Sequence, residues 1–260
     1  MALRLVPIGS GSRGNATLVE YGATRLLVDA GLSARTLTRR LEAVGRPPRT
    51  LSAILLSHEH NDHASGAEAF SCKHGVPVVC SAATLAALDL SPQHVAEWIP
   101  LPEAAPLELG DFRVESFPLP HDAARPVGFV LRATGLRVGL ATDLGHATTL
   151  VVERLRGANV LMIESNHDER MLRDGAYPWQ LKQRVGGRLG HLSNVEAAAL
   201  LERVVGSDCQ AVVLAHLSEH NNTPELARRA AAQALQRAGA KRTAMRVASG
   251  RGPTPAIEIG

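Results

Sequence analysis

Short apolar runs separated by turn residues recur along the whole chain. Many are rich in β-branched side chains and are bounded by Gly, Pro, Asn or Asp, a pattern typical of buried or half-buried strands. The runs predict strands over 3–8, 16–21, 25–29, 53–57, 76–80, 112–117, 127–133, 137–142, 159–164, 210–215 and 243–248.

Other segments space their apolar residues with the period of a helix, and most of them open on Ser, Thr or Asn as candidate N-caps. They predict helices over 33–44, 81–88, 148–155, 194–205 and 223–238. Two strand-rich blocks, 1–60 and 107–142, each precede more helical stretches, so we expect two packed sheets with helices outside. One domain over residues 1–260 is expected, with Arg251–Pro255 as a loose terminus.

Bulk composition narrows the function classes only slightly. The net charge is +3, with 28 basic residues, which mildly favours an anionic partner. Aromatic residues are 3% of the chain, so contacts to nucleic acid should be mainly to phosphate. No apolar run could span a bilayer and no secretory pattern is evident, so we expect a cytoplasmic protein without a membrane partner. Three dispersed cysteines predict neither disulfides nor a thiolate metal site.

A glycine-rich segment after the first strand has the form of a dinucleotide-binding loop. Gly9 to Gly14 reads G-x-G-x-x-G, and Asp29 lies where such a unit places its ribose-binding carboxylate. That motif requires a helix at its third glycine, whereas Ala16–Gly22 has the pattern of a strand entering a hairpin. No nicotinamide or flavin is therefore expected.

The strongest chemical signal is the segment His58-Glu59-His60-Asn61-Asp62-His63, which reads H-x-H-x-D-H directly after a strand pattern. Alternate residues of an extended segment point the same way, and a following turn directs the last two elsewhere. One short loop can therefore supply ligands to two neighbouring cations. A solvated polar loop is the alternative interpretation.

Three further candidate ligands follow apolar strands. His121, Asp143 and His216 each come at the carboxyl end of a predicted strand, where open sheets collect ligands. A single histidine in that position is usually a surface or core residue. Three such positions together with the H-x-H-x-D-H loop instead favour a metal site.

Several segments together resemble the metallo-β-lactamase superfamily, and in particular its bacterial YycJ/WalJ-like branch. The H-x-H-x-D-H loop is specific to the superfamily, and the GHLSN and HLSxxNN segments are specific to the branch. The matching segments are 10–15, 27–33, 58–63, 121–129, 141–145, 166–168, 190–194 and 216–222.

The resemblance implies an α+β fold, a four-layer αββα sandwich with a dinuclear metal site along one edge. It assigns His58, His60 and His121 to one metal and Asp62, His63 and His216 to the other, with Asp143 bridging. Two divalent ions would be held. Imidazole with carboxylate favours zinc, and manganese is the alternative.

Such an ion pair would generate a bridging hydroxide that attacks in line. Asp62 would orient this nucleophile. His191 would position the scissile phosphate or protonate the leaving oxygen, as a comparable histidine does in the related RNase Z-type phosphodiesterases; the alternative is a helix-entry residue bound by backbone. The residues expected to bind the substrate are Ser10, Ser12, Arg13, Asn15 and His167.

The resemblance implies hydrolysis of a phosphodiester in nucleic acid, with 5′ to 3′ exonuclease action on DNA. Candidate phosphate contacts are Arg13, Arg125, Lys182, Arg184 and Arg188. Two alternatives remain at this point. One is a small-molecule hydrolase acting on a lactam, a thioester or a cyclic phosphodiester, and the other is a metal-binding regulatory protein.

Overall fold

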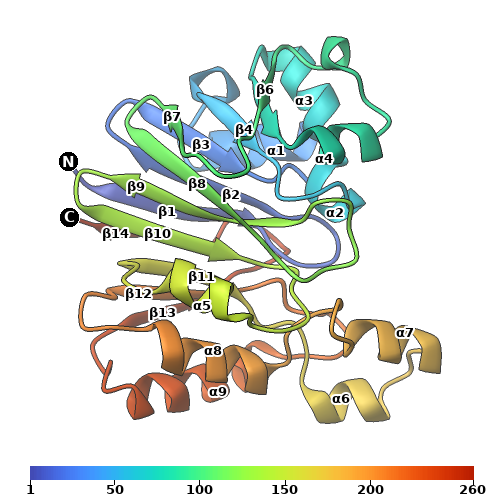
Figure 1. Ribbon diagram of the computed structural model, residues 1–260, viewed down its shortest axis with the longest axis vertical. Coiled ribbons are helices and arrows are strands. Elements are labelled where there is room, and N and C mark those ends of the chain that lie inside the picture. The colour runs from blue at the N-terminus through green and yellow to red at the C-terminus, as the bar shows by residue number, and fades with distance from the viewer.

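Two mixed seven-stranded sheets form the centre of the protein, whose computed structural model describes residues 1–260 (Figure 1). The first sheet has the order β14-β1-β2-β3-β4-β5-β6 and the second β13-β12-β11-β10-β9-β8-β7. The first contains β1 (Leu3–Gly9), β2 (Ala16–Tyr21), β3 (Thr24–Val28), β4 (Ala53–Leu55), β5 (Val78–Cys80), β6 (Trp98–Pro100) and β14 (Ile257–Ile259). The second contains β7 (Leu107–Leu109), β8 (Phe112–Pro118), β9 (Val127–Ala133), β10 (Leu136–Ala141), β11 (Val160–Glu164), β12 (Ala211–Ala215) and β13 (Ala244–Val247).

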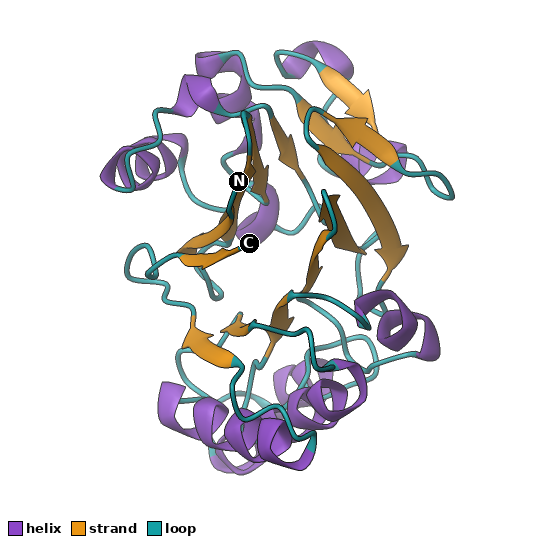
Figure 2. Cartoon of the chain, turned by 90° about the vertical axis from the view of Figure 1, so that its left-hand side faces the viewer, coloured by secondary structure: helices purple, strands orange, loops and turns teal.

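Helices cover the outer faces of both sheets, and the two chain ends lie close together (Figure 2). The first sheet carries α1 (Ala34–Ala43), α2 (Asn61–Ala64), α3 (Ala67–His74) and α4 (Ala82–Ala87). The second carries α5 (Thr149–Leu155), α8 (Asn194–Val204) and α9 (Pro224–Arg237). The short helices α6 (Glu169–Asp174) and α7 (Trp179–Val185) project from the body beside the same end as α2 (Figure 1). This is the predicted αββα arrangement.

Alternation along the strands builds three apolar layers. In β9, Phe129 and Leu131 belong to the core between the two sheets, whereas Val130 between them belongs to the core under α5, α8 and α9. In β3, Leu27 likewise faces α1 and α3 while its neighbours face the other sheet. The central strands of each sheet, such as β3, β11 and β12, are therefore buried on both faces, which explains why they are mostly apolar.

The helix starts follow from the predicted caps. Ser33, Ser81, Thr148 and Thr223 each accept a hydrogen bond from the backbone amide three residues on. The cap of α8 is Ser193, one residue before the predicted start, and Glu196 completes its capping box. No helix is long and apolar enough to cross a membrane.

The expectation that Arg251–Pro255 forms a loose terminus is wrong. Thr254 is buried, its amide donates to Pro7 O at 2.9 Å, and its hydroxyl accepts from the Ser249 amide at 3.1 Å. The chain then continues into β14, which pairs antiparallel with β1. The prolines and glycines of this segment mark a turn into an edge strand, since Pro and Gly are as common in ordered turns as in loose ends.

Candidate metal and catalytic site

The H-x-H-x-D-H segment forms the connection from β4 into α2. His58 lies in the extended part and is buried, while Asp62 and His63 lie in the first turn of α2. His60 is the residue immediately before that helix, with an extended backbone. Because the backbone changes from extended to helical, His58 and His60 point in one direction and Asp62 and His63 in another, as the sequence predicted.

The remaining three candidate ligands reach the same edge from the second sheet. His121 follows β8, Asp143 follows β10 and His216 follows β12 directly. Asp143 and His216 have positive φ values, 64° and 56°. Such conformations cost about 1–3 kcal/mol in residues other than glycine, so they persist only where the surroundings fix them, and they cluster at functional sites.

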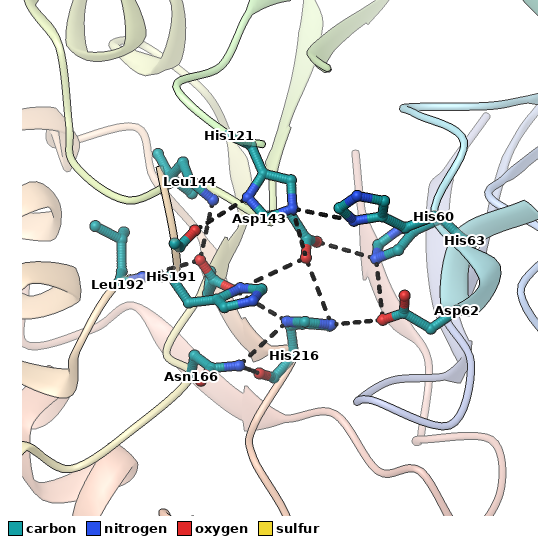
Figure 3. A network of polar contacts seen from close by, with 12 residues as sticks. His60, Asp62, His63, His121, Asp143, Leu144, Asn166, His191, Leu192 and His216 are labelled. Carbon is teal, nitrogen blue, oxygen red and sulfur yellow. Dashed lines mark hydrogen bonds and ion pairs between the residues drawn. The ribbon is translucent and has the colours of Figure 1, made fainter. Parts of the chain in front are cut away.

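All seven predicted ligands converge. Figure 3 labels all of them except His58. One group contains His58, His60 and His121, and its ligand atoms lie within 4.8 Å of one another. A second group contains Asp62, His63, Asp143 and His216 within the same limit. The geometry thus reproduces the two sets that the resemblance implied, with Asp143 beside both.

Four of the five histidines are oriented in the same way. In each, Nδ1 is engaged by the protein, which leaves Nε2 facing the cluster. The Nδ1 partners are Ser57 Oγ for His58 (2.9 Å), Asp29 Oδ2 for His63 (2.8 Å), Gly190 O for His121 (3.1 Å) and Glu164 Oε1 for His216 (2.9 Å). Outer partners of this kind fix the tautomer and ring direction of metal-binding histidines.

His60 has the opposite orientation. Its Nε2 lies 3.2 Å from Asp122 O, and its Nδ1 faces His121 Nε2 at 3.3 Å. His60 therefore presents Nδ1 to the cluster, whereas the other four present Nε2.

The cluster fits divalent cations. His58 Nε2 is buried and has no hydrogen-bond partner. The Asp143 carboxylate is 2% exposed and pairs only with imidazoles, the nearest being His63 Nε2 at 3.0 Å, with no lysine or arginine to balance it. A buried carboxylate among imidazole nitrogens is a donor set that divalent metal ions prefer.

Charge coupling within the cluster is strong. Burial alone would raise the pKa of Asp62, but the hydrogen bond from His216 and the charges of His63 and His216 together outweigh it and lower that pKa to about 2. Burial alone would lower the pKa of His216, yet Asp143, Asp62 and Glu164 raise it to about 10. The carboxylates are therefore ionised at neutral pH and available as ligands.

Glu164 is a central residue that the sequence reasoning did not select. It is fully buried at the end of β11, and its Oε1 contacts Nδ1 of both His191 (2.8 Å) and His216 (2.9 Å). Its Oε2 accepts from the amides of Leu144 and Leu192. Because both oxygens are occupied in this way, Glu164 orients the two rings. The sequence signal that could have identified Glu164 is its position as a charged residue at the end of an otherwise apolar strand.

His191 belongs to neither of these two groups, but with Asp143, Glu164 and His216 it forms a third group whose candidate ligand atoms also lie within 4.8 Å of one another. Its Nδ1 is held by Glu164, and the ring lines the cavity in front of the cluster. Burial would lower its pKa, but the charge and hydrogen bond of Glu164 outweigh it and raise that pKa. Glu164 thus favours the protonated form of the His191 imidazole, which lies beside the candidate metal ligands.

Comparison with known proteins identifies the family. The profile of the beta-lactamase superfamily domain matches residues 24–217. The chain belongs to the beta-lactamase superfamily. The exodeoxyribonuclease YycJ of Bacillus anthracis is 35% identical over 92% of this chain and 91% of its own length. The exodeoxyribonuclease WalJ of Streptococcus pneumoniae is 36% identical over 85% and 83%. The metallo-beta-lactamase fold protein YhfI of Bacillus subtilis has the same fold, with a TM-score of 0.78, 19% identity and full coverage of both chains.

In this beta-lactamase superfamily chain the glycine-rich loop supports the ligands. Asn15 Nδ2 donates to Asp62 O at 3.2 Å and lies 3.3 Å from Asp62 Oδ2, while Ser10 Oγ accepts from the His216 amide at 2.7 Å. Asp29 accepts hydrogen bonds from His63 Nδ1 and the Ser57 amide, so it supports the H-x-H-x-D-H loop. Ser10 and Asn15 therefore hold ligands in place. They do not line the cavity in front of the candidate metal ligands, called the catalytic cavity below.

Of the other three residues expected to bind the substrate, only one lines the catalytic cavity. Ser12 lines the catalytic cavity, whereas Arg13 lies outside it and pairs with Glu219. His167 is 3% exposed and does not line the cavity. The backbone of His167 forms a β-bridge with Ser193, and its carbonyl accepts a hydrogen bond from the Asn194 amide. His167 therefore lies behind the site and not on the cavity wall.

The catalytic cavity has a volume of about 250 Å³ and is mostly polar. α7 contributes Leu181, Arg184 and Val185 to one wall, and Arg184 pairs with Asp122 across it at 2.7 Å. Of the predicted phosphate contacts only Arg184 lines this cavity. Arg125 pairs with Glu103 at a separate cavity, and neither Lys182 nor Arg188 is in the lining.

Proposed function

We propose that the protein is a metal-dependent phosphodiesterase that degrades DNA from the 5′ end. The observation that carries this proposal is the seven-residue donor set with the separate, Glu164-bound His191 beside it. Two relatives matched over most of the chain are named exodeoxyribonucleases, which supports DNA as the substrate class.

We further propose zinc as the resident metal, with manganese as the alternative. Imidazole and carboxylate ligands without thiolate suit zinc, and a mixed oxygen and nitrogen set also accepts manganese. When bound, two such ions lower the pKa of a water molecule and neutralise charge that develops on the phosphate.

The protein's own groups then divide the proton transfers. Asp62 is ionised, and its Oδ2 faces the cluster, where it can accept a proton from the attacking water. His191 donates its Nδ1 proton to Glu164, and in its protonated form it carries a second proton on Nε2, which it can donate to the departing oxygen of the nucleotide. One group takes a proton while another supplies one.

Two other functions are alternatives to DNA degradation. A small-molecule hydrolase of the same fold would cleave a lactam, a thioester or a cyclic phosphodiester, and a regulatory protein would bind metal without turnover. A protonated imidazole beside the metals is of most use where an unactivated alkoxide must leave, as in DNA. We also propose that the protein acts in the cytoplasm.

A substrate panel separates these functions. Metal-loaded protein is incubated with 5′-phosphorylated single-stranded DNA labelled at either end, with the matching RNA, and with a β-lactam, a thioester and a cyclic dinucleotide. We expect mononucleotides from the labelled 5′ end first, and no release by the Asp143→Asn variant. Cleavage of a small substrate with intact DNA would overturn the proposed function.

A further inference from the structure

A groove beside the catalytic cavity has no role in the chemistry described so far. Its volume is about 630 Å³, against about 250 Å³ for the catalytic cavity. Ser218 lines both, so the groove begins where the catalytic cavity ends. A volume of this size is typical of ligand-binding clefts.

The groove carries an excess of positive charge. Arg13, Arg228 and Arg251 line it, and Glu219 is the single carboxylate among the lining residues. Arg13 pairs with Glu219 at 2.6 Å, whereas Arg228 and Arg251 are in no ion pair. Two guanidinium groups are therefore available to an anionic ligand, and arginine binds phosphate oxygens in a bidentate manner.

The loop that presents Arg251 is fixed to the first sheet. Arg40 donates to Ile8 O and to Gly250 O, both at 2.9 Å. The Ser10 amide donates to Ser249 O at 3.2 Å, and Ser249 Oγ accepts from the Arg251 amide at 3.1 Å. The wall is thus formed before any ligand arrives.

The opposite wall is the start of α9. Arg228 lies in the second turn of this helix, whose cap is Thr223. The amino end of a helix carries partial positive charge, which adds to that of the two free arginines. The Arg251 loop runs from β13 of the second sheet to β14 of the first, so its position relative to α9 depends on how the two sheets pack.

An aromatic pair stands between the two cavities. Tyr177 lines the catalytic cavity and His220 lines the groove, with ring centroids 5.8 Å apart in an edge-to-face arrangement. Aromatic rings beside a basic groove are the usual combination in proteins that hold single-stranded nucleic acid, because every base can stack on a ring.

We propose that this groove binds the backbone phosphates of the DNA strand beyond the scissile bond, with Arg228 and Arg251 as the contacts. The inference rests on the proposed function. The small catalytic cavity would hold the terminal nucleotide, and the remaining strand would pass Ser218 into the groove.

The test compares long and short substrates in the metal-loaded protein. For Arg228→Ala/Arg251→Ala we expect kcat/KM on a 5′-phosphorylated 12-nucleotide DNA to fall about ten-fold or more relative to kcat/KM on bis-p-nitrophenyl phosphate, mainly through KM. The salt dependence of the DNA reaction should also weaken by about 1.4 in slope, since each lost contact to a single strand removes about 0.7.

The matched control is Lys241→Ala/Arg242→Ala. These residues lie beside Thr243, ahead of β13 and at the opposite end of the second sheet, and their replacement removes the same charge. This variant should match wild type with both substrates. The groove proposal would be overturned if Arg228→Ala/Arg251→Ala kept the wild-type ratio of kcat/KM on DNA to kcat/KM on bis-p-nitrophenyl phosphate, together with the wild-type salt slope. Failure of wild type to degrade DNA at all would instead overturn the proposed function.

Discussion

At the scale of single residues, the site depends on partners that hold each imidazole in one direction. Asp29, Ser57 and Glu164 are not among the seven candidate ligands, yet each engages an Nδ1 atom of a ligand histidine. Partners of this kind typically change metal affinity or activity 10- to 100-fold when removed.

The role of His191 can be tested through the leaving group. His191→Ala removes the proposed proton donor, so kcat on DNA should fall about 10²- to 10³-fold. With bis-p-nitrophenyl phosphate, whose leaving group needs no proton, the fall should stay within about ten-fold. Steady-state kinetics on both substrates, with metal content measured on the same samples, provide the comparison.

His94→Ala is the matched control, since His94 is exposed and does not line the catalytic cavity. It should behave as wild type on both substrates. Equal losses for the two substrates in His191→Ala would show that His191 does not act as an acid.

The sequence identified the ligands because each one stands next to an apolar strand or in a dense polar motif. Glu164 also ends such a strand, but it has no neighbouring motif and its contacts come from Leu144, His191 and His216, residues distant in the chain. The opposite ring orientation of His60 likewise depends on Asp122 O, a backbone atom that no sequence pattern specifies.

At the scale of elements, the metal loop is pressed against the segment after β3. A Cβ atom on Gly31 would lie 1.7 Å from Asp62 O, so this backbone contact requires glycine. The Gly31 amide also donates to Asn15 O at 2.9 Å, which joins three segments at one point.

Gly31→Ala should therefore displace the loop, weaken metal binding by at least about ten-fold and destabilise the fold by about 1–3 kcal/mol. Gly206→Ala is the control, because a Cβ atom there meets nothing within 4 Å. Metal titration and urea denaturation of both variants measure these effects. Normal metal affinity in Gly31→Ala would refute the packing argument.

A second element-scale prediction concerns Glu20 on β2, which is 6% exposed and binds Arg4, Arg25 and Arg46. Burial alone would raise its pKa, but hydrogen bonds from Arg46 and Arg4 outweigh that and lower it. A lowered folded-state pKa stabilises the protein above the unfolded value of about 4.3, and that stabilisation is lost as pH falls.

Glu20→Gln should therefore reduce the free energy of unfolding by about 2–4 kcal/mol at pH 7, and the difference from wild type should shrink between about pH 5 and pH 3. Glu258→Gln, whose side chain is 62% exposed, should change it by less than about 0.5 kcal/mol. Urea denaturation across this pH range tests both. A difference that is constant with pH would contradict the assignment.

The five helices with a clear apolar face were predicted to within one or two residues. The sequence did not predict α2, α3, α6 or α7. α6 buries only Leu172 and α7 buries no residue, so neither has an apolar face to recognise. β6, β7 and β14 were also missed. Each has three residues, too few to establish an alternating pattern, and each is defined by its pairing with a neighbouring strand.

At the scale of the whole molecule, the site exists only where the two sheets meet. The first sheet supplies the H-x-H-x-D-H loop, and the second supplies His121, Asp143 and His216. Neither sheet alone contains a complete set for either ion. The expectation of one domain over residues 1–260 stays a prediction, and the shared site agrees with it.

The central claim is that two divalent ions in this donor set drive the degradation of DNA. Metal-depleted protein is titrated with Zn²⁺, and in parallel with Mn²⁺, while bound equivalents and nucleotides released from 5′-phosphorylated single-stranded DNA are recorded together. We predict negligible release without metal and a rise to full activity as the second equivalent binds. Full activity in the metal-depleted protein, or none with two equivalents of either ion bound, would contradict this account.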